Sequence, residues 1–427
     1  MVETETKIQR YDSYNDSGVE WLGEIPEHWE LTRLGTRFEE RRTKVSDKDY
    51  PPLSVTKNGT VPQLSNAAKT NDGDNRKLVK KGDFVINSRS DRKGSSGIAY
   101  QDGSVSLINI VMEPLNIHPI YCNYLLKCYS FIEEFYRMGH GIVADLWTTR
   151  YDEMKAIMVG IPPLPEQTAI AQFLDDKTTK IDQAIAIKQQ QIALLKERKQ
   201  ILIHKAVTKG VTSSAVEMKD SGVVWIGQIP EHWEVKRLKY IFNKIQTGTT
   251  PSTSNQNFYN GNIDWYNPKD LNNEFLIEAE RKVGELAINK REVKYFSGDS
   301  VLIVGIGATA GKTSYLIDKA TFNQQITGFH SDTEHNKYYF YQLRSFSETM
   351  LKTANYTTLA ILNNEFFKVF KLVQPPLSEQ KEIAQYIETA SAKIETVISL
   401  KEQEISKLQE YKSSLINSVV TGKVRVC

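Results

Sequence analysis

The sequence is poor in cysteine and has no long apolar run, and each deficit excludes a class of protein. The three cysteines, Cys122, Cys128 and Cys427, are too few and too far apart for a disulfide framework or a four-ligand zinc site. No apolar stretch approaches the roughly 20 residues of a membrane span, and the polar N-terminus has no signal-peptide core. We therefore expect a cytoplasmic protein without a membrane segment or a metal site.

The chain also lacks an excess of charge of either sign. Its formal net charge is +2 over 427 residues, with 40% hydrophobic and 25% charged residues. This composition is that of a globular protein long enough for two or three domains. A DNA-binding protein of this size that acted alone would usually be more basic. If DNA is the ligand, its basic groups must gather on one surface, or a partner must supply phosphate contacts.

What the sequence does contain is a coiled-coil pattern that occurs twice. In the stretch 170–207, seam residues alternate at spacings of four and three. They are Ile181, Ile185, Lys188, Ile192, Leu195, Lys199 and Leu202, and they return in the second half of the chain as Ile394, Ile398, Lys401, Ile405, Leu408, Lys412 and Leu415. The pattern predicts two helices of roughly 40 residues, each about 60 Å long. Their matched lysine interruptions favour pairing with each other, and the alternative is an ordinary amphipathic helix packed on its own domain.

Two shorter blocks repeat as well, so the chain is a duplication. Residues 16–30 and 220–234 share twelve of fifteen positions, including Ile-Pro-Glu-His-Trp-Glu, and Pro-Leu-x-Glu-Gln opens each long helix at residues 163–167 and 376–380. The segments between these blocks barely match. We predict an N-terminal arm (1–30), a first variable domain (31–160), a central helix (161–210), a second arm (211–234), a second variable domain (235–372) and a C-terminal helix (373–427).

The two variable segments have mixed α and β character. Short apolar runs at residues 83–86 and 300–304 follow glycine turns and predict strands. Residues 121–137 and 337–353 have helical spacing. We therefore expect an α+β protein whose two tandem variable domains are separated by two long helices that pair as an antiparallel coiled coil.

Apparent catalytic motifs fail in detail. The loop at residues 304–313 resembles a P-loop, but Ile306 stands where its first glycine is required. The string Asn267-Pro268-Lys269-Asp270 lacks the aromatic residue on which a flipped base would stack in an amino-methyltransferase. His28 and His232 have no second ligand at metal spacing, and the repeated tryptophans of the arms are best explained as packing anchors. We expect no catalytic residue in this chain.

Polar residues that could contact DNA concentrate in the variable segments. Arginine and lysine read guanine in the major groove, and asparagine and glutamine read adenine. The candidates are Lys57, Asn58, Arg89, Arg92, Lys93, Arg150, Asn267, Lys269, Lys312, Thr313, Asn323, Gln324, Gln325, Tyr356 and Thr357. Any one of them could equally be part of a solvated loop, and it is their concentration that favours DNA binding.

The repeated arm, the Pro-Leu-x-Glu-Gln helix start and the tandem order together resemble the specificity subunit of type I restriction–modification systems. The resemblance covers essentially the whole chain. It implies a non-catalytic DNA-binding subunit in host defence. Each variable domain, 31–160 and 235–372, would be a target-recognition domain that reads one half of a split double-stranded site, and the helices would fix the gap. It further implies two methyltransferase subunits that use S-adenosylmethionine, and restriction subunits that use ATP, so this subunit would hold no cofactor itself.

Two other interpretations stay open at the level of sequence. One is an enzyme, either a methyltransferase or an NTPase, built on residues 305–313. The other is a coiled-coil scaffold with no DNA role. Binding of S-adenosylmethionine or ATP by the isolated chain would favour the first, and failure to bind any DNA would favour the second.

Overall fold

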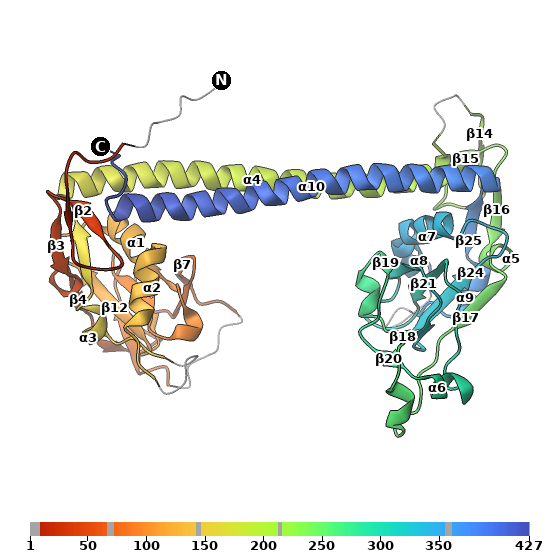
Figure 1. Cartoon of the computed structure of the whole chain (residues 1–427), viewed down its shortest axis with the longest axis horizontal. Coiled ribbons are helices and arrows are strands. Elements are labelled where there is room, and N and C mark those ends of the chain that lie inside the picture. Colours follow the sequence, from red (N-terminus) through yellow and green to blue (C-terminus); the bar gives the residue numbers. More distant parts are fainter. Residues whose placement is uncertain (1–8, 66–71, 142–146, 212–215, 355–360, 427) are drawn as a thin grey trace. The chain divides into compact units, whose positions relative to one another are not determined.

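A computed structural model describes residues 9–65, 72–141, 147–211, 216–354 and 361–426 (Figure 1). The chain forms two compact units, one of residues 1–189 with 402–427 and the other of residues 190–401. We call them unit 1 and unit 2, and we call the variable segments 31–160 and 235–372 head 1 and head 2. Each unit contains one arm, one head and part of each long helix.

Head 1 is built on a four-stranded antiparallel sheet in the order β10-β9-β12-β4. Its strands are β4 (Phe38–Glu40), β9 (Phe84–Asn87), β10 (Ser96–Ile98) and β12 (Asn109–Pro114). Helices α1 (Pro119–Lys127) and α2 (Tyr129–Arg137) share a buried core with one face of the sheet, in which Phe84, Ile86 and Met112 lie with Tyr121 and Leu125. The other face of the sheet buries Val85 and Val111 in a smaller cluster.

Head 2 repeats this arrangement despite its different sequence. The sheet order is β17-β24-β21-β22, extended by β19, with strands β17 (Lys244–Thr247), β19 (Phe275–Leu276), β21 (Ser300–Val304), β22 (Thr313–Leu316) and β24 (Ile326–His330). Helices α7 (Asn336–Ser345) and α8 (Ser347–Thr353) follow, as α1 and α2 do in head 1. One constant offset in residue number relates β9, β10 and β12 of head 1 to β21, β22 and β24 of head 2, since the pair Asn87–Asn109 of head 1 corresponds to the pair Val304–Ile326 of head 2. The predicted strands at 83–86 and 300–304 are confirmed.

Both stretches with predicted helical spacing, 121–137 and 337–353, are helical, and each is divided into two helices. Cys128 has an extended backbone (φ −66°, ψ 152°), and its Sγ accepts the N–H of Phe131 at 3.5 Å, so it ends α1 and caps α2. Phe346, which is 1% exposed, separates α7 from α8, but its backbone is not extended (φ −95°, ψ 9°) and its side chain does not cap α8. The helical character predicted for residues 121–137 and 337–353 is therefore confirmed. The spacing did not reveal the break within each stretch, because helical periodicity resumes at once beyond it.

The remaining elements complete each unit. In unit 1 they are β1 (Tyr14–Asp16), β2 (Glu24–Pro26), β3 (Glu30–Arg33), β5 (Lys44–Val45), β6 (Leu53–Thr56), β7 (Gly59–Pro62), β8 (Arg76–Val79), β11 (Gly103–Val105), α3 (Tyr151–Met154) and β13 (Met158–Ile161). In unit 2 they are β14 (Met218–Asp220), β15 (Gln228–Pro230), β16 (Glu234–Arg237), α5 (Leu238–Ile241), β18 (Ile263–Tyr266), β20 (Lys282–Val283), α6 (Glu285–Asn289), β23 (Thr321–Phe322), α9 (Asn364–Val369) and β25 (Lys371–Gln374). The pairs β3–β13 and β16–β25 join the beginning and end of each head.

The two long helices, α4 (Leu164–Lys209) and α10 (Leu377–Val420), pack together as an antiparallel coiled coil (Figure 1). In unit 1, Asp182 of α4 pairs with Lys412 of α10 at 2.7 Å, and Lys188 pairs with Glu404. The residue number thus falls along α10 as it rises along α4. In unit 2, Lys199 pairs with Glu395 at 3.0 Å. These contacts confirm the expected antiparallel pairing.

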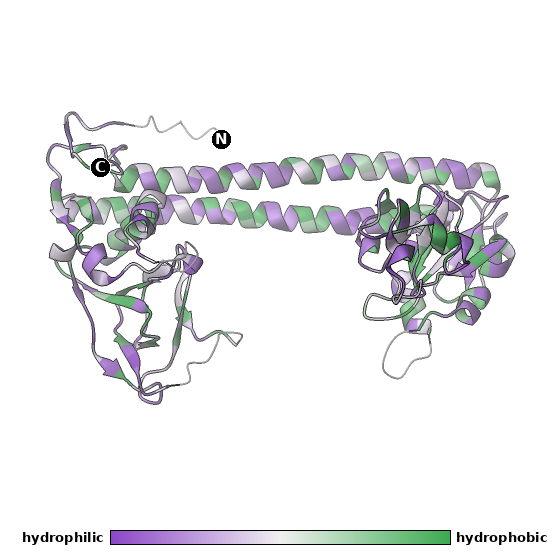
Figure 2. Cartoon of the chain, turned by 60° about the horizontal axis from the view of Figure 1, so that its bottom comes forward, coloured by the Kyte–Doolittle hydropathy of each residue, from purple (hydrophilic) through white to green (hydrophobic). Residues whose placement is uncertain are grey.

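The apolar seam residues are shielded from solvent along this pair. Ile181 and Ile398 are 8% and 3% exposed. The other apolar seam residues are half-buried, namely Ile185, Ile192, Leu195, Leu202, Ile394, Ile405, Leu408 and Leu415. Figure 2 shows hydrophobic and hydrophilic segments alternating along both helices.

Ion pairs between the helices explain why lysine interrupts the two apolar seams at equivalent positions. The pairs Lys199–Glu395 and Lys412–Asp182 are one contact made twice, because the two lysines are separated by the same offset in sequence as the two acids. A partly exposed ion pair contributes only about 0.2–1 kcal/mol. These pairs therefore specify the direction and register of the helices more than they stabilise them.

The glutamate and glutamine of the Pro-Leu-x-Glu-Gln motif, at the start of each long helix, form hydrogen bonds with the arm and the head of the same unit. In unit 2, Glu379 accepts from Trp233 Nε1 at 2.9 Å and contacts His232 Nε2 at 2.7 Å. Gln380 accepts the N–H of His335 at 2.9 Å and donates to the Pro375 carbonyl at 2.9 Å. In unit 1, Glu166 and Gln167 make the same contacts with Trp29, His28, His118 and Pro162. The arm histidines and Trp29 and Trp233 thus make structural contacts.

The end of each helix completes the core of a unit. Val419 and Val420 of α10 pack with Leu22, Ile25 and Trp29 of the first arm. In unit 2, the end of α4 packs in the same way: Ile203, Ala206 and Val207 lie in one core with Ile229 and Trp233 of the second arm. Tyr338 Oη and Gln342 Nε2 also donate to the Val207 carbonyl, at 3.0 and 3.2 Å.

The Glu379→Ala variant tests the contacts that join the second arm to the start of α10. Trp233 is fully buried, so removal of the carboxylate leaves its Nε1–H without an acceptor, which costs about 1–3 kcal/mol. We expect a lower urea midpoint for unfolding, followed by circular dichroism. The matched control is Glu382→Ala, an exposed carboxylate on the same helix. Equal midpoints for the two variants would contradict the assigned role of Glu379.

Candidate nucleic-acid interface

Three loops meet at the same edge of the main sheet in both heads. Loop A joins β9 to β10 (residues 88–95) or β21 to β22 (305–312) and has eight residues in each head. Loop B precedes β12 (106–108) or β24 (323–325). Loop C precedes the short helix α3 (148–150) or α9 (361–363).

Main-chain hydrogen bonds hold the three loops together. In head 1, the Ser88 carbonyl accepts the N–H of Thr149 at 3.0 Å, and Ser88 N–H donates to the Ile108 carbonyl at 3.4 Å. In head 2, the Gly305 carbonyl accepts from Leu362 N–H and Gly305 N–H donates to the Gln325 carbonyl, both at 2.7 Å. Because these bonds use backbone atoms, the loop side chains can differ without loss of the arrangement.

Most of the predicted DNA-contacting residues lie at or beside this edge. Arg89, Arg92, Lys93 and Lys312 belong to loop A, Asn323, Gln324 and Gln325 to loop B, and Arg150 to loop C. Thr313 begins β22, is 8% exposed and donates its hydroxyl to the Gly311 carbonyl. Asn267 accepts from Asn323 Nδ2 at 3.3 Å and thus adjoins loop B.

The other predicted residues lie elsewhere. Lys57 and Asn58 form the turn of the β6–β7 hairpin, and Lys57 lines a cavity together with Arg89 and Arg92. Lys269 directly precedes a short 3-10 turn (Asp270–Asn272), and the Asp270 carboxylate accepts the N–H of Asn267 at 2.7 Å. Asn267-Pro-Lys-Asp is therefore a capped turn. Tyr356 and Thr357 lie outside the described residues.

The cavity in head 1 is lined by two further residues, Arg76 and Asn109, that the sequence analysis did not propose. It measures about 700 Å³, and Arg76 and Asn109 lie in its wall beside the loop A arginines. Burial lowers the pKa of Arg76, whose Nε donates to Ser104 Oγ at 2.9 Å. Asn109 is 5% exposed and its Oδ1 is buried with no hydrogen-bond partner among the described residues. The sequence feature that could have pointed to Asn109 is its position at the start of the apolar run Ile110-Val111-Met112.

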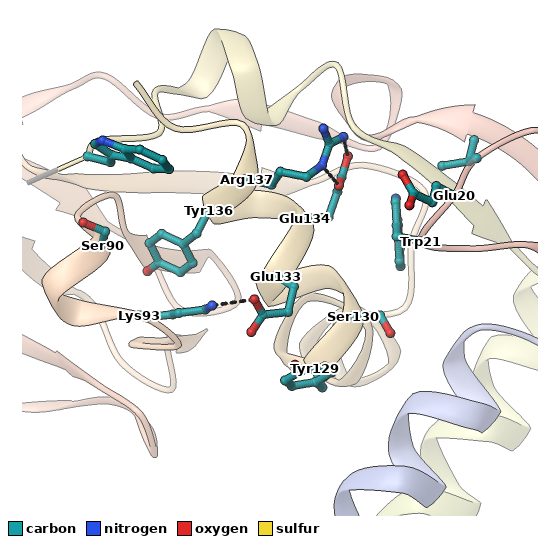
Figure 3. Close-up of a pocket in the computed structure, with 12 residues that line it drawn as sticks. Glu20, Trp21, Ser90, Lys93, Tyr129, Ser130, Glu133, Glu134, Tyr136 and Arg137 are labelled. Carbon is teal, nitrogen blue, oxygen red and sulfur yellow. Dashed lines mark hydrogen bonds and ion pairs between the residues drawn. The ribbon is translucent and has the colours of Figure 1, made fainter. Parts of the chain in front are cut away.

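The positive charge of loop A is partly neutralised. Asp91 pairs with Arg89 at 3.1 Å and with Arg92 at 3.8 Å. Lys93 pairs with Glu133 of α2 at 2.6 Å, across a pocket of about 660 Å³ (Figure 3). In the same pocket Glu134 binds Arg137 in a two-pronged ion pair and raises the pKa of Arg137. The side chain of Arg92, which is 69% exposed, is the more accessible of the two loop A guanidinium groups.

The structure removes the main alternative for loop A of head 2. Strands β21 and β22 pair as an antiparallel hairpin, so the glycine-rich loop leads into a strand. A phosphate-binding loop would lead into a helix, whose N-terminus would bind the phosphate. Gly311 has a positive φ (84°), as does Gly94 at the equivalent place in head 1 (79°), so these glycines serve the turn.

Head 2 also contains a serine, a histidine and an aspartate whose side chains are linked by hydrogen bonds, as in a catalytic triad. His330 Nδ1 lies 3.0 Å from Ser300 Oγ, and its Nε2 lies 3.1 Å from Asp332. However, Ser300 is fully buried and its hydroxyl donates to the Ser297 carbonyl at 2.7 Å. A nucleophile must reach its substrate, so this group is structural.

Other reactive groups are also unsuited to chemistry. Burial raises the pKa of Cys128 to about 12 and that of Cys122 well above its usual value, so both thiols are protonated. Within the described ranges there is no cluster of three histidine, cysteine or acidic residues able to hold a metal ion. Nor does any helix in those ranges have the length and apolarity to cross a membrane.

Comparison with known proteins agrees with this duplicated architecture. The family described as the type I restriction modification DNA specificity domain matches residues 26–197 and 230–408. The chain belongs to this family. It is a specificity subunit with two tandem recognition domains, and it is not an enzyme.

Relatives cover nearly the whole chain. A putative type I restriction enzyme MjaX specificity subunit of Methanocaldococcus jannaschii is 26% identical, with 98% of this chain and 99% of the relative aligned. The MjaVIII specificity subunit of the same organism is 26% identical over 94% of both chains. A crystal structure of the HsdS subunit from Thermoanaerobacter tengcongensis covers 94% of this chain and 98% of its own, with 14% identity and a TM-score of 0.53. A structure from a study of type I complex assembly gives 13% identity, covers 93% and 98%, and has a TM-score of 0.68.

Proposed function

We propose that each head of this specificity subunit reads one half of a split site in double-stranded DNA through its loops A, B and C. The observation that carries the proposal is that the two heads share one sheet and one loop edge but differ in the side chains of that edge. Loop A of head 1 carries Arg89, Arg92 and Lys93, whereas loop A of head 2 is rich in glycine and alanine. Loop B of head 2 carries Asn323, Gln324 and Gln325. Two heads with the same backbone arrangement but different loop side chains are suited to the recognition of two different base sequences.

The paired helices set the distance between the half-sites in this proposal. Helix α4 is continuous from Leu164 to Lys209, and its ends pack in the cores of the two units. In this proposal the chain is divided, as predicted, into arms (1–30 and 211–234), heads (31–160 and 235–372) and helices (161–210 and 373–427). The subunit works in the cytoplasm with two methyltransferase subunits that bind S-adenosylmethionine, and with restriction subunits that use ATP. These partners would supply phosphate contacts that a chain with a net charge of +2 lacks.

An apolar surface on the helical pair of unit 2 suits a methyltransferase subunit. Leu194 (56% exposed) and Ile201 (47%) lie on α4, and Val397 (41%) and Leu400 (54%) lie on α10. Leu194 and Leu400 each follow a seam isoleucine by two positions. In an antiparallel pair, equivalent heptad positions flank the seam on the same side, so the four residues form one surface. Exposed apolar patches of this kind mark protein–protein interfaces.

Exchange of head 1 tests the proposed function. Residues 31–160 are replaced with the corresponding segment of a relative, and the chain is expressed with its methyltransferase. We expect one half of the methylated site to change and the other half to stay, because the main-chain bonds that hold head 2 are untouched. Single-molecule sequencing of methylated adenines gives the site. A site that stays the same in both halves, or changes in both, would refute independent reading by the heads.

A second test addresses the apolar surface. The double variant Leu194→Asp, Leu400→Asp places two charges where we expect an apolar contact. Native mass spectrometry of the co-expressed complex should show fewer methyltransferase copies per specificity subunit. The control is Gln200→Asp with Ser399→Asp, two exposed positions directly after seam residues. An unchanged copy number in the first variant would exclude this surface.

A further inference from the structure

Gln324 is the exposed member of the amide cluster in loop B of head 2. The neighbouring Asn323 is 6% exposed, and its side chain is directed inward. Asn323 Oδ1 accepts the N–H of Gln325 at 3.1 Å, and Asn323 Nδ2 donates to Asn267 and to Gln325 Oε1, each at 3.3 Å. Gln325 Nε2 donates to the Ile306 carbonyl at 3.4 Å. Asn323 and Gln325 therefore fix the shape of the loop, and Gln324 is presented outward.

A hydrogen bond from Thr250 orients the side-chain amide of Gln324. The Thr250 hydroxyl donates to Gln324 Oε1, so this oxygen keeps one lone pair for another donor. Within the described part of the chain, no hydrogen-bond acceptor contacts Gln324 Nε2. The exposed edge of the amide thus offers one donor and one acceptor side by side.

The segment that carries Thr250 is itself rigidly placed. Gly248 approaches the carbonyls of Phe322 and Asn323 so closely that a Cβ at this position would collide with them. Thr249 N–H donates to the Phe322 carbonyl at 2.9 Å, and Trp265 Nε1 donates to the Thr249 carbonyl at 3.0 Å. Little conformational freedom is left to lose when a ligand binds, which favours a specific contact.

A donor beside an acceptor on one amide matches one base edge in the major groove. Adenine presents N7 as acceptor and the N6 amino group as donor, and glutamine or asparagine pairs with both. We propose that Gln324 reads an adenine in the half-site bound by head 2, with Nε2 donating to N7 and Oε1 accepting from N6. Thr250 is the positioning residue. The equivalent residue of head 1 is Leu107, which is 42% exposed and has no amide, so this contact belongs to head 2 alone.

This inference rests on the proposed function, and its test uses the full chain in complex with its methyltransferase. Binding is measured to duplexes in which each base pair of the head 2 half-site is replaced in turn. At one A·T pair the wild type should lose about 5- to 150-fold in affinity on replacement. The Gln324→Ala variant should bind the original and the replaced duplex alike at that pair, and should keep its preferences elsewhere.

Atom replacement sharpens the test. A duplex with 7-deazaadenine at this position lacks only the N7 acceptor, so it should weaken binding of the wild type and leave Gln324→Ala unaffected. Gln324→Glu should shift the preference to cytosine, whose N4 donates to a carboxylate. Thr250→Val should reduce discrimination at the same pair only. The control is Asn289→Ala, an exposed amide at the end of α6.

Two outcomes would overturn the inference. One is a Gln324→Ala variant that keeps its preference at every base pair. The other is an equal loss of affinity for all duplexes, which would indicate a phosphate contact. Either result leaves the proposed function standing as long as exchange of a head still changes its half-site.

Discussion

The antiparallel pairing of α4 and α10 is the constraint on which the rest of the structure depends. Neither unit has a complete core without it, because Val419 and Val420 of α10 lie against the first arm, and Ile203 and Val207 of α4 lie against the second arm. The apolar seam supplies the attraction, and the repeated pairs Lys199–Glu395 and Lys412–Asp182 specify one direction and one register. A slip of the seam would separate these charges at both places.

A fixed frame with variable heads has a clear physical basis in this chain. Side chains make the junction between arm, head and helix, and the glutamate and glutamine of the Pro-Leu-x-Glu-Gln motif are the same in both halves. Backbone atoms make the bonds between loops A, B and C, as Thr149 with Ser88 and Leu362 with Gly305 show. Side-chain changes at the junction would therefore affect stability, whereas changes in the loops alter the surface and leave the fold intact. This division allows the two heads to present different surfaces on the same fold.

Features that repeat in sequence could be predicted, and features that depend on tertiary contacts could not. The seam from Ile181 to Leu202 and the anchoring role of Trp29 and Trp233 followed from spacing and duplication. The breaks at Cys128 and Phe346 did not, because helical spacing continues on either side of each break. The common sheet of the heads was also missed, although the pairs Gly94 with Gly311 and His118 with His335 share one offset in sequence.

The candidate site shows the same limit. Residue type pointed to Arg92 and Gln324 as possible readers of bases. It could not distinguish an outward amide from an inward one, and Asn323 proved to be largely buried. Asn109 and Thr250 were missed because their importance comes from neighbours distant in sequence, namely the loop A arginines and Gln324.

The most direct test lengthens both helices together. Residues 192–198 of α4 face residues 396–402 of α10, as the Lys199–Glu395 pair indicates, and duplication of both heptads keeps the seam in phase. The pair grows by about 10 Å, which corresponds to about three base pairs at roughly 3.4 Å each. Sequencing of methylated adenines should show both half-sites unchanged and the gap widened by about three base pairs. A folded, active variant with an unchanged gap would contradict the central claim that the paired helices set the spacing.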